Sequence, residues 1–62
     1  MTAKEAESLL IKSGFLLART KGSHRIYKNN NIRVVLPFHA GKDLHPKIVK
    51  EIKSIIENLT AK

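Results

Sequence analysis

The residues that could do chemistry gather in one short stretch, Thr20-Lys21-Gly22-Ser23-His24-Arg25. Apolar runs flank it at residues 15–18 and 26–27, a pattern typical of a hairpin turn. A histidine at such a turn can accept and donate protons near neutral pH, because its ordinary pKa is about 6.5. The neighbouring cations Lys21 and Arg25 suit a polyanion. We interpret the stretch as one that holds a phosphodiester beside a catalytic His24; the alternative is an ordinary hairpin turn with a solvated histidine.

The charge of the chain is strongly basic and unevenly distributed. Its 62 residues carry a formal net charge of +7 at pH 7. Residues 8–42 contain no Asp or Glu, and all the acids lie in the two terminal segments. Such an excess indicates an anionic partner, which is most often nucleic acid and less often an acidic protein or a membrane surface.

Length and composition predict a single domain over residues 1–62. Because the chain has no cysteine, it has neither a disulfide framework nor a thiolate zinc site, which fits the reducing cytoplasm. No apolar run is long enough to cross a bilayer, and no signal peptide opens the chain, so we expect no membrane partner.

Periodicity and turn residues predict the element order α-β-β-β-α. A capping box at residues 2–5 begins a helix over residues 3–13, and Gly14 ends it. Pro46 is expected at the first position of a second helix, which has one apolar stripe. Three strands are predicted between the helices, at residues 15–20, 24–28 and 32–36, and Pro37 should end the third.

These elements predict an α+β fold. Short turns favour a three-stranded antiparallel sheet, and the apolar face of each helix should pack on the same side of it. The other face of the sheet and the turns would then be free for RNA. Double-stranded-RNA-binding domains use the same order, which is an analogy of fold and not of function.

A set of short motifs runs along nearly the whole chain: Gly14-Phe15, Lys21-Gly22-Ser23-His24, Ile26-Tyr27, Pro37-Phe38-His39, Lys42, Leu44 and Pro46. Together they resemble the HicA family, also called YcfA-like proteins, which are small mRNA interferases of bacterial toxin–antitoxin pairs. A Gly-Ser-His triplet alone is weak evidence, but its combination with the downstream Pro-x-His in a short basic chain is specific. In one departure, Lys47 and Ile48 stand where the family often has a small residue and Thr, so any role of that hydroxyl is absent.

The resemblance implies a fold like that of a double-stranded-RNA-binding domain and an endoribonuclease that cleaves mRNA and arrests growth. Carried over by position, it implies that His24 is the catalytic residue. It also implies a HicB-type antitoxin protein that binds the toxin and blocks its active site, and it implies no cofactor.

RNA carries its own nucleophile, the 2′-hydroxyl, which an enzyme must deprotonate and align with the P–O5′ bond. One histidine acting as general base contributes about 10²–10⁴-fold to the rate, and cations stabilise the developing phosphorane charge. We assign His24 as this base and as a candidate acid in the later step. The predicted RNA contacts are Lys21, Gly22, Ser23, Arg25 and Lys28.

Other residues have two interpretations each. His39 is either a second acid for the 5′-oxygen leaving group or a loop residue bonded to backbone. Tyr27 either stacks on a base or packs in the core. His45 either caps the second helix or lies in solvent. The spacing of the histidines and Asp43 is unlike that of zinc sites, so we expect no metal.

Two other functions compete with RNA cleavage. The same cationic face could belong to a non-catalytic RNA-binding module of the double-stranded-RNA type, or it could serve only to dock an acidic protein. Cleavage in the presence of a chelator, together with resistance of a 2′-deoxy substrate, would distinguish the enzyme from both alternatives.

Overall fold

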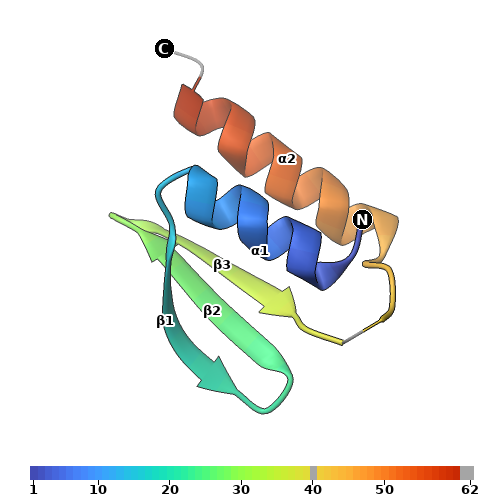
Figure 1. Cartoon of the computed structure of the whole chain (residues 1–62). Helices are drawn as coiled ribbons and strands as arrows, with labels where there is room; N and C mark the ends of the chain where they lie inside the picture. Colours follow the sequence, from blue (N-terminus) through green and yellow to red (C-terminus); the bar gives the residue numbers. More distant parts are fainter. Residues whose placement is uncertain (40, 61–62) are drawn as a thin grey trace.

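The computed structural model describes residues 1–39 and 41–60. The chain forms α1 (Ala3–Lys12), β1 (Leu16–Lys21), β2 (His24–Asn29), β3 (Ile32–Pro37) and α2 (Pro46–Thr60). The strands form one antiparallel sheet in the order β1-β2-β3, and both helices lie on the same side of it (Figure 1). The predicted fold class and element order are therefore confirmed.

The start of α1 is fixed by the capping box that the sequence predicts. The Glu5 backbone N–H donates to the Thr2 hydroxyl at 3.2 Å, and the Thr2 backbone N–H donates to the Glu5 carboxylate at 2.9 Å. The Thr2 backbone N–H and hydroxyl both donate to the Glu5 carboxylate, and these two hydrogen bonds hold the pKa of Glu5 below its usual value. The helix ends at Lys12, one residue earlier than predicted, and Gly14 follows with φ +94°.

The start of α2 matches its prediction at Pro46. The His45 imidazole accepts a hydrogen bond from the Lys47 backbone N–H at 3.1 Å, so it acts as the helix cap. His45 is also exposed, so it caps the helix and lies in solvent at the same time.

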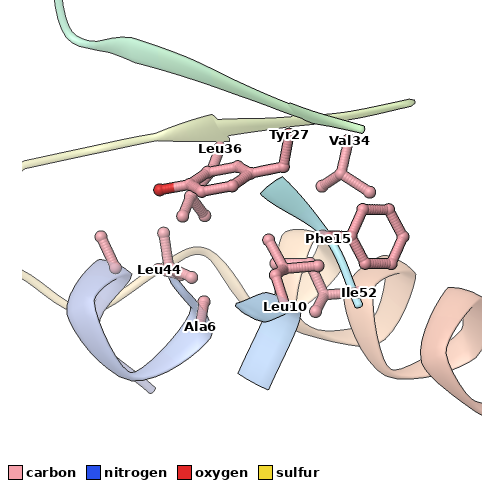
Figure 2. Close-up of a cluster of buried hydrophobic side chains, with 9 residues drawn as sticks. Ala6, Leu10, Phe15, Tyr27, Val34, Leu36, Leu44 and Ile52 are labelled. Atoms are coloured by element: carbon pink, nitrogen blue, oxygen red, sulfur yellow. The ribbon is translucent and has the colours of Figure 1, made fainter. Parts of the chain in front are cut away.

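One hydrophobic core fills the space between the sheet and the helices. Its fully buried members come from α1, from the turn after it, from β2 and β3, and from α2 (Figure 2). The largest are Leu10, Phe15, Tyr27, Leu36 and Ile52. Because these side chains come from every element except β1, the core fixes β2 and β3 more firmly than the exposed edge strand.

Two tight turns and one irregularity set the register of the sheet. Gly22 and Ser23 join β1 to β2; Gly22 has φ +58°, which suits the first central position of a type II′ turn. Asn30 adopts φ +54° in the turn between β2 and β3. The register of β1 against β2 shifts between Leu17 and Arg19, so a bulge changes which β1 side chains share a face.

Candidate active site and nucleic-acid interface

His24 is the first residue of β2, directly after the two-residue turn. Its neighbours across the sheet are Lys21 on β1 and Pro37 on β3. The residue is exposed, and no hydrogen bond joins its imidazole to any residue of the described ranges. The ring is therefore accessible to a ligand and is not oriented by a carboxylate.

The face of the sheet that points away from the helices can be read from the strand register. Tyr27 and Leu36 are buried against the helices, and side chains alternate along a strand, so residues of the opposite parity point outward. Directly opposed residues of antiparallel strands share a face. We call this outward surface the open face, and it consists of Leu16, Arg19, Lys21, His24, Ile26, Lys28, Arg33, Val35 and Pro37.

The open face is cationic. Arg19, Lys21, Lys28 and Arg33 all lie on it, and none of its residues is acidic. The bulge in β1 contributes to this arrangement, because it places Arg19 and Lys21 on the same face as Leu16. Positive side chains from all three strands therefore share this face with His24, and no carboxylate lies on the same surface.

The turn before His24 is held by a backbone hydrogen bond and leaves room for a ligand. The Phe38 backbone N–H donates to the Ser23 carbonyl at 2.7 Å, which connects the turn to the segment after β3. A Cβ atom at Gly22 would meet nothing within 4 Å. A phosphate could therefore approach the backbone of Gly22 closely.

Arg25 follows His24 in the sequence but lies on the helix side of the sheet. Its guanidinium donates to the Glu7 carboxylate at 2.9 Å and lies over the Phe38 ring, 3.9 Å from the ring centroid. Hydrogen bonds to Tyr27 and Glu7 raise the pKa of Arg25. Of the predicted RNA contacts, Lys21 and Lys28 share the open face with His24, whereas Arg25 does not.

Comparison with protein families decides the family of the chain. The family model described as the HicA toxin of bacterial toxin–antitoxin systems matches residues 3–59. The chain belongs to the HicA toxin family. The match extends from the first residue of α1 almost to the end of α2 and so includes the whole sheet. Comparisons with curated proteins and with solved structures found no match.

Membership of the family confirms the resemblance noted from the sequence and makes this HicA chain the toxin of a toxin–antitoxin system. An antitoxin is therefore its partner by family. Neither helix in the described ranges has the length and apolar content that a membrane crossing requires.

His39 of this HicA toxin lies two residues beyond Pro37, the β3 residue that pairs with His24. It is exposed, and its carbonyl accepts a hydrogen bond from the Lys42 backbone N–H at 3.2 Å. It lines a hollow of about 240 Å³ together with Asp43 and His45. In the described ranges no three His, Asp or Glu side chains are grouped closely enough to hold a metal ion. This hydrogen bond uses the backbone of His39 and not its imidazole. The two interpretations of His39 therefore stay predictions.

Tyr27 belongs to the core, which settles its two interpretations. The residue is fully buried among the other core side chains (Figure 2). Its hydroxyl donates to the same Glu7 oxygen that accepts from Arg25. Burial, supported by the hydrogen bond to Glu7, raises the pKa of Tyr27 to about 12. The hydrogen bonds from Tyr27 and Arg25 lower the pKa of Glu7.

The Tyr27 hydroxyl predicts a specific alkaline transition. Because its folded pKa is raised, its contribution to stability is complete below the ordinary tyrosine pKa of about 10 and is lost as the pH rises through about 12. Tyr27 is the chain's single tyrosine, so the ultraviolet absorbance of tyrosinate reports this group alone. We expect Glu7→Gln to lower the midpoint of the titration, because the charged acceptor is removed. An unchanged midpoint in that variant would show that burial alone sets the pKa.

Sequence reasoning missed three features of the site. Arg19 and Arg33 lie on the open face, although neither was predicted as an RNA contact. Glu7 reaches across from α1 to the strand that carries His24. Alternation along β2 could have predicted that Arg25 and His24 lie on opposite faces of the sheet. Nothing in the local sequence indicates the bulge in β1 or the contact of Arg25 with Glu7.

Proposed function

We propose that this HicA toxin is an endoribonuclease that cleaves mRNA with His24 as its general base. The observation that supports the proposal most directly is the position of His24. Its exposed imidazole has no described hydrogen-bonding partner and stands beside Lys21 on a cationic face that lacks acids. Such a surface attracts a polyanion and brings a proton acceptor to its backbone.

The proposed reaction is a transesterification within the RNA. His24 takes the proton of the 2′-hydroxyl, the 2′-oxygen forms a bond to phosphorus, and the P–O5′ bond breaks. The products are a 2′,3′-cyclic phosphate and a 5′-hydroxyl, whose oxygen takes a proton from the imidazolium of His24 or from His39. The charges balance without any group beyond the RNA and the protein.

Lys21 and the turn are the proposed phosphate contacts at the cut. Lys21 pairs directly with His24 across the hairpin, so its ammonium can stabilise the phosphorane. Gly22 and Ser23 offer backbone N–H groups at a turn with open space above it. Lys28 contacts the RNA farther along the same strand. Arg25 is left out of this set because Glu7 already neutralises it on the other face.

The proposed partner is a HicB-type antitoxin that covers His24 and blocks RNA cleavage, and the proposed location is the cytoplasm, where mRNA lies. Family membership supports the partner, because the matching model describes the toxin of a toxin–antitoxin system. Cleavage of mRNA by the free toxin would arrest growth, and the antitoxin would relieve the arrest.

The experiment is a cleavage assay with the purified toxin in a metal chelator. The substrate is a single-stranded RNA oligonucleotide, and the matched control carries one 2′-deoxyribose at the cleaved position. We expect cleavage of the first and none of the second, with a 2′,3′-cyclic phosphate at the new end. Binding without products would indicate a non-catalytic RNA-binding module, and absence of binding would indicate a surface that serves only to dock protein.

A further inference from the structure

The open face extends well beyond the residues that cleavage at His24 requires. Its members form three rows across the sheet, and each row has one residue from each strand. The rows are Lys21-His24-Pro37, Arg19-Ile26-Val35 and Leu16-Lys28-Arg33. Lys28 lies four residue positions after His24 on β2, so the outer rows lie about 13 Å apart at the usual rise of a strand.

The charges of the third row have no role at the cut. Lys28 and Arg33 are direct partners across β2 and β3, at the end of the face farthest from His24. No residue of the open face is acidic, so nothing on this surface neutralises them. Two adjacent cations at that distance from the cleaved bond are placed to contact a different phosphate.

The middle row is apolar on β2 and β3, beside Arg19 on β1. Ile26 and Val35 are direct partners in the second row, and Val35 is 43% exposed although it is a large hydrophobic residue. Leu16 in the third row is 71% exposed. Aliphatic side chains can pack against the flat faces of unpaired bases and remove apolar surface from water. A duplex does not present those faces, because its bases are stacked and paired inside the helix.

Resting on the proposed function, we propose that the open face is a track for single-stranded RNA. The cleaved phosphate lies at the row of His24, bases lie over Ile26 and Val35, and a second phosphate contacts Lys28 and Arg33. The track holds roughly four nucleotides at the ~3.4 Å spacing of a stacked strand, and fewer when the strand is extended. This assigns RNA-binding roles to Arg19, Ile26, Arg33 and Val35, and it assigns unpaired RNA as the substrate.

The test compares two double variants that change the net charge equally. Lys28→Glu with Arg33→Glu alters the open face, and Lys47→Glu with Lys50→Glu alters exposed lysines of α2. The probe is a short single-stranded RNA with 2′-deoxyribose at the cut, and binding is measured by fluorescence anisotropy at several salt concentrations. We expect the first variant to lose more than tenfold in affinity and to have a salt dependence shallower by about 1.4, whereas the second changes little.

Two further binding measurements test the apolar residues of the middle row and the preference for single-stranded RNA. Val35→Ser is expected to weaken binding of the single strand without changing its salt dependence, because no phosphate contact is removed. A hairpin duplex with the same cleaved sequence is expected to bind more weakly than the single strand. Circular dichroism confirms that each variant is folded.

Equal losses of affinity in the two double variants would overturn the proposal, and so would preferential binding of the duplex. Loss of antitoxin binding without loss of RNA binding would show that the face is a protein interface instead. The result is separable from the proposed function. If the wild type and the Lys28→Glu, Arg33→Glu variant cleave RNA equally, the proposed track is wrong but the proposed nuclease activity is not. If the open face binds RNA that is never cleaved, the proposed nuclease activity is wrong but the proposed track is not.

Discussion

Replacement of His24 by alanine is expected to slow RNA cleavage by about 10²–10⁴-fold and to abolish growth arrest. The loss follows because no other imidazole lies on the open face to take the 2′-hydroxyl proton. The fold should be unchanged, since His24 is exposed and its side chain makes no hydrogen bond within the described ranges. Single-turnover cleavage and thermal unfolding, measured on the same preparation, separate the two effects.

His45 is the matched control for His24, whereas His39 tests the proposed acid step. His39→Ala should leave the rate within a fewfold of wild type if His39 is only a loop residue, and should lower it strongly if His39 protonates the leaving group. His45→Ala removes a helix cap, so it should reduce stability by about 1 kcal/mol and leave cleavage intact. Cleavage at the wild-type rate by the His24→Ala variant would exclude the proposed mechanism.

The elements of this fold could be predicted because each carries a local signal. The capping box at Thr2 and Glu5 fixes the start of α1, and Pro46 fixes the start of α2. The strand ends differ from the predictions by one residue. β1 begins one residue after Phe15, because the Phe15 backbone N–H donates to the Leu10 carbonyl at 2.9 Å and so belongs to the end of the helix. The Phe15 side chain is buried in the core.

The faces of the strands could be predicted only in part. Alternation along β2 implies that Arg25 and His24 point to opposite sides, and the structure has them so. In β1 the register shift between Leu17 and Arg19 interrupts this alternation, and no residue type at that position predicts a bulge. The bond from Arg25 to Glu7 joins residues 18 positions apart, so no local pattern could indicate it.

Phe15→Ala is expected to unfold the free toxin. Phe15 is fully buried, and removal of a buried phenylalanine side chain costs about 3–5 kcal/mol. A chain of 62 residues has roughly 3–9 kcal/mol of stability in total, so the loss is most or all of it. Chemical denaturation measured by circular dichroism gives the change directly. Its neighbour Leu16 is 71% exposed, so Leu16→Ala should change stability by no more than about 0.5 kcal/mol.

His24→Ala and Phe15→Ala should therefore lose toxicity for different reasons. His24→Ala leaves a folded toxin that still binds its antitoxin, whereas Phe15→Ala leaves a chain that folds only when something binds the native state. Because a ligand stabilises the native state by mass action, antitoxin should restore the far-ultraviolet signal of Phe15→Ala in proportion to its concentration. If Phe15→Ala remained folded alone and still cleaved RNA, the core around Tyr27 would not be what holds the open face in shape.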